Sequence, residues 1–275
     1  MNEFNQQELH PQVFEEDHLK TILQEFQKDG FVILKDVFSK NYIEALYSEF
    51  ISDYKSIFLN EKWDNPGENK ILVNGSAIKR GNRRYQFSIE VKGSFNSPNL
   101  YANPLILPFL KKLFNVPFVI SDLTCVTSLP RAKKMAIHRD GVIFEGNPLA
   151  HLLPSHAIGL LIPLVSFTRL NGPTRYWPGS HRQSYTLNYE HDQNFIEPEV
   201  KIGSCILMDH RLIHSGNPNQ SDQIRPLLYC NYSLPWYFDS NNFESQTHLI
   251  VDDKNYELID NKYKPLFQRR NMKLQ

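Results

Sequence analysis

The chain has 275 residues, enough for one sizeable domain, and its 30 basic and 30 acidic side chains give a formal net charge of zero. This balance gives no electrostatic reason to expect binding to nucleic acid or to an anionic membrane surface. No apolar run approaches the roughly 20 residues that a membrane-spanning helix needs, and the first residues lack the features of a secretory signal. We therefore expect a cytoplasmic protein that folds as a single domain over residues 1–275.

The N-terminal part, about residues 16–116, is predicted to be mainly helical. Apolar side chains recur at helical spacing in three segments, and Gly30 follows the first of them. Ser39 can cap the second helix, and a proline in the first turn of the third loses no needed hydrogen bond. The expected elements are a helix over 16–28, a strand over 31–37, a helix over 41–58, and a helix that begins at Asn103 or Pro108 and ends before Pro117.

From residue 118 onward the pattern changes to strands and turns. The fold class is therefore mainly β with flanking helices, and the β core is expected over about residues 117–238. Runs rich in apolar, β-branched and aromatic residues predict strands over 119–129, 202–209 and 226–232. The cysteines form no C-x-x-C pair, which predicts buried free thiols in a reducing compartment; they are Cys125, Cys205 and Cys230.

Candidate metal ligands lie at the edges of these strands. His138 and Asp140 form an H-x-D pair, and residues i and i+2 of a strand point to the same side. His214 follows another strand and would reach the same ion only in the complete fold. Two imidazoles and one carboxylate can occupy one face of an octahedral Fe(II) and leave three adjacent positions open. We therefore predict a catalytic iron site formed by His138, Asp140 and His214.

Arg225 follows the second histidine and would suit the far end of a dicarboxylate co-substrate, because a guanidinium offers a planar fork of donors. Each signal alone is weak, since H-x-D pairs occur by chance and arginines are mostly solvated or in surface ion pairs. The histidines, Asp140 and Arg225 all lie at the ends of predicted strands, and this common placement favours a metal and co-substrate site. His210 and His214 have the spacing of a helical zinc pair, but the serines and glycines around them predict a strand and turn.

Five stretches of the chain occur in an order that is typical of one enzyme family. They are 29–37 (DGFVILKDV), 138–140 (HRD), 171–181 (NGPTRYWPGSH), 203–209 followed by His214, and 219–222 before Arg225. Together they extend over about residues 16–235, nearly the whole chain. In this they resemble the phytanoyl-CoA dioxygenase family of Fe(II)/2-oxoglutarate-dependent oxygenases.

The resemblance implies a double-stranded β-helix, or jelly roll, with the iron site at one mouth. It makes His138, Asp140 and His214 the iron ligands and pairs Arg225 with the distal carboxylate of 2-oxoglutarate, while O2 takes the last open position. Asp140 argues for hydroxylation, because related halogenases carry glycine or alanine in its place. One departure is Gly216, where family members often have a serine that touches the co-substrate.

Further pocket residues are predicted from their neighbourhood. Cys125 and Thr127 share one face of the strand before the triad, and they either line the co-substrate pocket or fill the barrel interior. The basic run 79–84 is expected to be a solvated loop or, alternatively, to hold an anionic part of the substrate. The candidates for substrate contact are Phe87, Phe144 and Trp236.

We expect a hydroxylase that oxidises an unactivated C–H bond of a small molecule, in a tailoring step of natural-product biosynthesis of the antibiotic or toxin type. The aromatic residues and few charges near the site favour a compact polar substrate over a long alkyl chain. The alternatives are an acyl-CoA or lipid hydroxylase, a non-catalytic sensor of 2-oxoglutarate and iron, and a zinc hydrolase on the same ligands. A small-molecule substrate is the one partner expected, with no nucleic acid and no membrane; the oligomeric state is not predicted.

Overall fold

A computed structural model describes residues 3–5, 16–58, 71–72, 77–141, 143–144, 147, 149–184, 189–239 and 247–272. Its α-helices are α1 (Glu16–Asp29), α2 (Lys40–Phe58), α3 (Pro98–Tyr101), α4 (Ile106–Phe114) and α5 (Asp253–Glu257). The short 3-10 helices are η3 (Gly93–Asn96), η4 (Ala150–Leu152), η5 (Ser180–Arg182) and η6 (Lys264–Phe267). None of the helices in these residues has the length and apolar content to cross a bilayer.

The described strands form one large sheet and one small sheet. The large sheet runs in the order β1-β2-β9-β7-β11-β6-β5-β4-β3, and the small sheet pairs β10 with β8. All pairings are antiparallel except that of β1 with β2. The bounds are β1 (Glu3–Asn5), β2 (Phe31–Lys35), β3 (Ile71–Leu72), β4 (Ala77–Gly81), β5 (Arg84–Ser88), β6 (Val119–Ser128), β7 (Ala157–Pro163), β8 (Thr174–Tyr176), β9 (Cys205–Asp209), β10 (His214–Gly216) and β11 (Arg225–Ser233).

The predicted helices and strands occur in the expected order. Among the strands that were not predicted, β3, β4 and β5 join β2 in the large sheet, so the part before residue 117 is less helical than expected. Helix α4 begins at Ile106, between the two predicted starts, and Asn103 accepts backbone hydrogen bonds from its first turn. Ser39 caps α2 as expected, since its Oγ accepts a hydrogen bond from the backbone of Tyr42. The sequence analysis assigned no element after residue 238, yet η6 packs there through an edge contact between Phe267 and Tyr101, with ring centroids 4.9 Å apart.

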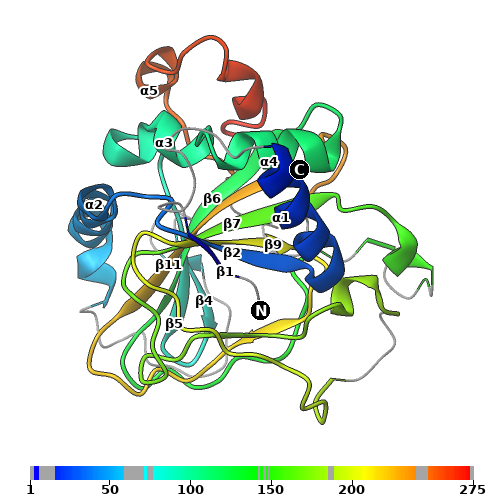
Figure 1. The fold of residues 1–275 in the computed structure, drawn as a ribbon. Helices are drawn as coiled ribbons and strands as arrows, with labels where there is room; N and C mark the ends of the chain where they lie inside the picture. The colour runs from blue at the N-terminus through cyan, green and yellow to red at the C-terminus, as the bar shows by residue number, and fades with distance from the viewer. Residues whose placement is uncertain are drawn as a thin grey trace.

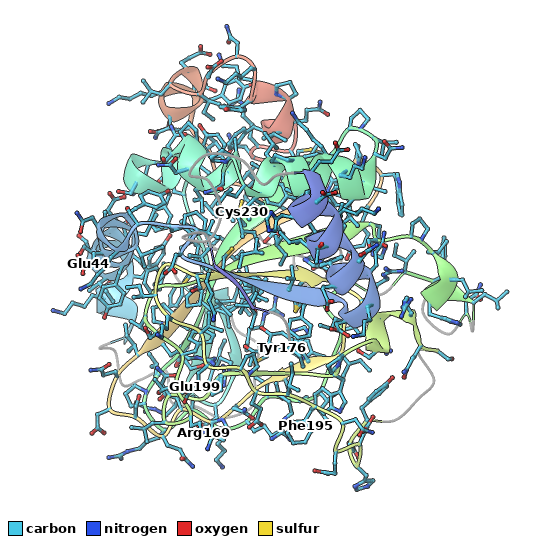
Figure 2. The ribbon with its side chains drawn as sticks, in the orientation of Figure 1. Glu44, Arg169, Tyr176, Phe195, Glu199 and Cys230 are labelled. Carbon is cyan, nitrogen blue, oxygen red and sulfur yellow. The ribbon has the colours of Figure 1, made fainter. Side chains whose placement is uncertain are left out.

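The helices cover one face of the large sheet (Figure 1). Helices α3, α4 and α5 lie on that side, and α1 packs on α4 through Phe26 and Phe109, with ring centroids 5.2 Å apart. The main hydrophobic core fills the space between this layer and the sheet, and Cys230 lies within it (Figure 2). All three cysteines are buried and free, as predicted. The other face of the sheet is left for the small sheet and its loops.

Alternation along β6 and β11 separates the two faces of the large sheet. On β6, Leu123 and Cys125 belong to the helix-covered core, whereas Thr124 and Val126 line a cavity on the opposite face. Successive side chains of a strand point to opposite faces of the sheet. A shift of one residue would therefore move the core residues to the cavity face and the cavity residues to the core. The functional site therefore uses the even-numbered positions of β6, which pair with odd-numbered positions of β11.

This alternation corrects three predicted pocket residues. Cys125 and Thr127 stand on the helix-covered face, where their side chains meet each other with Sγ and Oγ1 3.6 Å apart. Phe87 has the same orientation on β5 and packs against Phe50 and Tyr54 of α2, with ring centroids 5.5 Å and 5.0 Å away. All three are interior residues, which for Cys125 and Thr127 is the second of the two alternatives considered.

The basic run 79–84 is not the solvated loop that we expected. It forms the end of β4, a tight turn and the start of β5. Gly81 and Arg83 in that turn both adopt positive φ angles, +142° and +54°. The hairpin carries Arg84 into the cavity side of the sheet, where its side chain is buried.

Three buried histidines predict that stability falls in mild acid. Burial lowers the pKa of His156, His181 and His248 to about 4. The unfolded chain takes up these protons near pH 6.5, so the histidines stabilise the fold fully above that pH and progressively less towards pH 4. The free energy of unfolding in urea should fall by about 1 kcal/mol per histidine between pH 7.5 and 5.5. Burial also lowers the pKa of His214 to about 4, which makes four such histidines in the metal-free protein. His248→Gln should therefore remove about one quarter of the slope, whereas exposed His191→Gln should leave it unchanged; equal slopes in all three proteins would contradict the assignment.

Candidate metal centre and co-substrate pocket

The structure brings together the three residues of the predicted triad. His138 and His214 are joined by a pair of reciprocal backbone hydrogen bonds, each 3.0 Å long, which place their rings side by side with centroids 4.3 Å apart. The backbone N–H of Asp140 donates to the carbonyl of His210, at 2.9 Å. One carboxylate oxygen of Asp140 then lies 3.4 Å from Nε2 of His138 and 3.6 Å from Nε2 of His214.

The donor atoms of this triad fit a divalent metal ion. In His138 and His214, Nδ1 lies 2.9 Å and 3.0 Å from the backbone carbonyls of Ala136 and Leu212. A carbonyl can only accept, so each Nδ1 carries the proton and each Nε2 presents its lone pair. Metal-binding histidines are usually held in this way through their second nitrogen. The ligand atoms of the three residues lie within 4.8 Å of one another.

The electrostatics of the triad also suit metal binding. Burial lowers the pKa of His214 to about 4, so its ring is neutral at pH 7. Burial alone would raise the pKa of Asp140, but the neighbouring imidazoles hold it well below its usual range, so the carboxylate is ionised. His138 and Asp140 are partly exposed to the cavity. A neutral imidazole and an ionised carboxylate are the forms that bind metal.

The segment 171–181, which the resemblance singled out, holds His214 in place. Strand β8 pairs with β10, with Tyr176 directly opposite His214. The ring of Tyr176, which is labelled in Figure 2, stacks on Phe31 of β2 with 4.9 Å between centroids. This contact connects the small sheet to the large one. Ser180 accepts a hydrogen bond from the backbone N–H of Ile213, at 2.9 Å. The conformation around His214 is thus fixed by a segment far from it in sequence.

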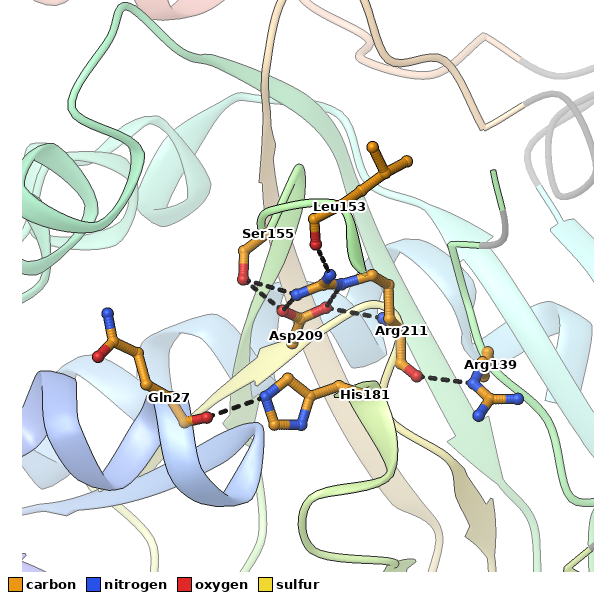
Figure 3. A network of polar contacts seen from close by, with 7 residues as sticks. All are labelled: Gln27, Arg139, Leu153, Ser155, His181, Asp209 and Arg211. Carbon is orange, nitrogen blue, oxygen red and sulfur yellow. Dashed lines mark hydrogen bonds and ion pairs between the residues drawn. The ribbon is translucent and has the colours of Figure 1, made fainter. Parts of the chain in front are cut away.

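A buried ion pair organises the turn between β9 and β10 (Figure 3). Arg211 contacts Asp209 twice, with Nε 2.9 Å from one carboxylate oxygen and a terminal nitrogen 2.7 Å from the other. Ser155 donates to the same carboxylate, and the carbonyl of Leu153 accepts from the guanidinium. Arg139, between the two ligands of the H-x-D pair, donates to the carbonyl of Arg211 at 2.9 Å. This network connects both ligand-bearing stretches to one rigid turn.

The triad opens into a cavity of about 470 Å³ between the two sheets, a size that is typical of sites for small ligands. Arg225 lines the cavity, as does Arg84 from β5. Their side chains are only 2% and 1% exposed, and both donate to the hydroxyl of Ser128. Arg84 also donates to the carbonyl of Asn217, at 2.9 Å, and Arg225 to that of Gly172.

The two guanidinium groups have no carboxylate partner among the ion pairs of the described residues. Burial and, to a lesser extent, the nearby charge of Arg225 together lower the pKa of Arg84 to about 9. Nε of each group has no hydrogen-bond partner within the described part of the chain. Buried charges normally have a partner of opposite charge, so these two guanidinium groups are expected to bind an anion.

Gly216 explains how Arg84 enters the pocket. A Cβ atom at position 216 would lie only 2.9 Å from a terminal nitrogen of Arg84 and 3.1 Å from its central carbon. The glycine, which departs from the family's frequent serine, therefore leaves the space that the guanidinium of Arg84 occupies. Gly216 is visible in the sequence as a departure, but its relation to Arg84 is not, because Arg84 lies in a distant basic run.

The remaining predicted substrate residues do not line the described part of the cavity. Phe144 is 65% exposed and Trp236 is 59% exposed, and Trp236 lies beside His156, with ring centroids 6.0 Å apart. The cavity instead contains polar residues that the sequence analysis did not select: Gln86, Asp122, Thr124, His210 and Asn231. Asp122 and Thr124 are polar at alternate positions of β6, a signal that could have identified the cavity face.

Comparison with known proteins agrees with this site. The family model of phytanoyl-CoA dioxygenase (PhyH) matches residues 26–227. The dioxygenase aneA of Aspergillus aculeatus is 26% identical over 238 residues, which cover 84% of this chain and 78% of aneA. The iron/alpha-ketoglutarate-dependent dioxygenase ausU of Aspergillus calidoustus is 22% identical over 221 residues, 76% of this chain and 69% of ausU.

Solved structures show the same fold. HygX from Streptomyces hygroscopicus, with nickel, 2-oxoglutarate and hygromycin B bound, superposes with a TM-score of 0.57 at 15% identity and covers 80% of this chain and 89% of its own. The epimerase SnoN, in complex with Fe3+, alpha-ketoglutarate and nogalamycin RO, gives a TM-score of 0.56 at 16% identity over 80% of this chain and 84% of its own. The predicted double-stranded β-helix is therefore confirmed.

Proposed function

This chain belongs to the phytanoyl-CoA dioxygenase (PhyH) family of Fe(II)/2-oxoglutarate-dependent non-haem dioxygenases, and on that premise we propose that it hydroxylates an unactivated C–H bond of a small molecule in natural-product biosynthesis. His138, Asp140 and His214 would bind the iron. Arg225 and Arg84 would bind the distal carboxylate of 2-oxoglutarate. Bound iron, 2-oxoglutarate and O2 supply oxidising power as the co-substrate is converted to succinate and carbon dioxide.

One observation carries this proposal: a metal-binding triad and an unpaired arginine pair line the same buried cavity. The protein's contribution is to hold the co-substrate, orient the substrate and limit the access of water. Asp140 supports hydroxylation over halogenation, because its carboxylate occupies the position that a halide would need.

The lining of the cavity supports a polar substrate over an acyl chain. Gln86, Asp122 and Asn231 present polar groups on the sheet, and a long alkyl chain would cover them without offering them any hydrogen bond. The bound molecules of the two structural neighbours, hygromycin B and nogalamycin RO, support a substrate of the natural-product type. We therefore favour a tailoring reaction over the acyl-CoA or lipid alternative.

The proposal predicts both a spectrum and a product. Under anaerobic conditions the protein with Fe(II) and 2-oxoglutarate should show a weak visible charge-transfer band, and admission of air should yield succinate. A band without succinate, even with candidate substrates present, would indicate a sensor. Activity with zinc that needs neither O2 nor 2-oxoglutarate would indicate a hydrolase. Mass spectrometry of the product would distinguish a gain of one oxygen from the epimerisation that the name of SnoN describes.

A further inference from the structure

Along β11 the cavity has an arginine at one end and a carboxylate beside the other, and Arg80 and Asp239 also line it. Four residues of β11 face the cavity, and three of them pair directly with residues of β6 that line it. At one end Arg225 stands opposite Ser128, and at the other Asn231 stands opposite Asp122. At about 3.4 Å per residue, these end positions are roughly 20 Å apart along the strand. The arginine end suits the co-substrate, so the acidic end is left for the substrate.

Asp122 is a buried carboxylate with neutral partners. It is 2% exposed and accepts hydrogen bonds from Ser121 Oγ and Asn231 Nδ2, each at 2.9 Å, with Thr124 Oγ1 at 3.4 Å. It forms no ion pair with the described residues, and the titratable groups that act on it electrostatically include His210, Asp239 and Arg269. Burial raises its pKa to about 7. A cation in the cavity would offset the cost of keeping this carboxylate ionised.

Two neighbouring side chains offer further hydrogen-bond acceptors. Oδ1 of Asn231 and both ring nitrogens of His210 are buried and have no hydrogen-bond partner. Both side chains approach the same spot over Gly159, because a Cβ there would lie 3.1 Å from Asn231 Oδ1 and 3.7 Å from His210 Nε2. Buried polar atoms are rarely left without partners, so these atoms indicate a ligand.

The kinds of atom at this end specify the chemistry of the ligand. A carboxylate and an amide oxygen are acceptors, and so is an imidazole nitrogen that carries no proton. An ammonium group has three N–H donors, no acceptor and a positive charge, and it satisfies all three. A hydroxyl has one donor, and a carboxylate or phosphate would be repelled by Asp122. We propose that Asp122, Asn231 and His210 bind a protonated amine of the substrate, an inference that rests on the proposed function.

This placement limits which carbon is oxidised. The carbonyl of His210 accepts hydrogen bonds from the backbone of Asp140 and of Gly141, each at 2.9 Å, so the amine site adjoins the predicted iron ligand. The substrate amine would therefore lie near the metal, and the oxidised carbon would lie only a few bonds from the nitrogen.

The test uses three probes that share a cyclohexyl ring: cyclohexylamine, which is protonated at pH 7.5, cyclohexanol, which has nearly the same size, and N,N,N-trimethylcyclohexylammonium, which is bulkier and has the charge but no N–H donor. Each is titrated into the metal-free protein by calorimetry and into the anaerobic Fe(II) and 2-oxoglutarate complex by the charge-transfer band. Cyclohexylamine should bind at least about tenfold more tightly than the other two, because it supplies both the charge and the donors.

Variants separate the site from general charge effects. Asp122→Asn, which keeps the size of the side chain, should reduce the preference for the amine to less than about threefold. Asp222→Asn makes the same change on an exposed turn and should keep the preference. His210→Phe, which keeps a ring without its nitrogens, should weaken the amine several-fold and serves as a second variant if Asp122→Asn does not fold.

The outcomes distinguish this inference from the proposed function. A normal charge-transfer band with equal binding of amine and alcohol would overturn the amine site and leave the oxygenase assignment standing. A preference for the amine that survives Asp122→Asn would also overturn it. Amine binding that Asp122→Asn abolishes, in a protein that shows no band with Fe(II) and 2-oxoglutarate, would support the amine site and refute the proposed use of the triad.

Discussion

Replacement of Asp140 by alanine is expected to reduce succinate formation by more than about 100-fold, because even residues that only support a metal ligand cost 10–100-fold when changed. The carboxylate lies between the two imidazoles, 3.4 Å and 3.6 Å from their Nε2 atoms, and supplies the one negative charge of the donor set. Without it, two neutral nitrogens remain to hold Fe(II). The measurement is succinate formed under air with saturating iron and 2-oxoglutarate, together with the iron content of the isolated protein.

The matched control is Asp222→Ala, which removes an exposed carboxylate and should leave succinate formation unchanged. In the metal-free protein the neighbours of Asp140 are the imidazoles of His138 and His214, so Asp140→Ala relieves no charge repulsion there. The melting temperature of the metal-free variant therefore shows whether it is folded, independently of iron binding. A folded Asp140→Ala protein with undiminished iron-dependent succinate formation would refute the assignment of Asp140 as a ligand.

The triad was predictable because local geometry and motif order both point to it. Residues i and i+2 of an extended segment share one side, so His138 and Asp140 need only a short straight stretch to reach one ion. The position of His214 depends on the whole fold, because it is set by strand pairing that cannot be read from a single sequence. Here the family resemblance supplied that information. Its backbone pairing with His138 is the structural form of that long-range information.

The face of β6 was not predictable from hydrophobicity, because nearly every residue of this strand is buried. A strand covered on both sides lacks the alternation of apolar and polar residues that would reveal its orientation. Cys125 and Thr127 were predicted to line the pocket, but they lie on the helix-covered face of β6. Asp122, which lies on the cavity face, was not predicted. Thr124 and Ser128, two and six positions after Asp122, are polar residues on the same face of β6. They are the weak signal that distinguishes this face from the core face.

Arg84 was missed for a different reason. A run of basic residues is usually solvated, and the sequence does not reveal that a tight turn after Gly81 directs this one side chain inward. Its relation to Gly216 arises from packing between strands that are far apart in the chain. Such a pair can be found only when both positions are seen together.

Replacement of Arg225 by alanine should weaken 2-oxoglutarate binding by roughly 100-fold, about 3 kcal/mol, the usual cost of removing one partner of a buried charge pair. The effect on the free protein should have the opposite sign. Arg84 and Arg225 are adjacent buried cations that both donate to Ser128, so removing one relieves repulsion in the protein without co-substrate. Anaerobic titration of the charge-transfer band measures the binding, and urea unfolding of the metal-free protein measures the stability.

Gly216→Ser tests whether the second guanidinium shares this role. The added side chain would collide with Arg84, so the single variant should lose about tenfold in affinity for 2-oxoglutarate as Arg84 is displaced. In an Arg84→Ala background the same serine has room and can donate to the co-substrate, so there it should improve binding. The two changes are therefore expected to be strongly non-additive in a double-mutant cycle. Additive losses would mean that Arg84 and position 216 act independently, and that Arg225 holds the carboxylate without them.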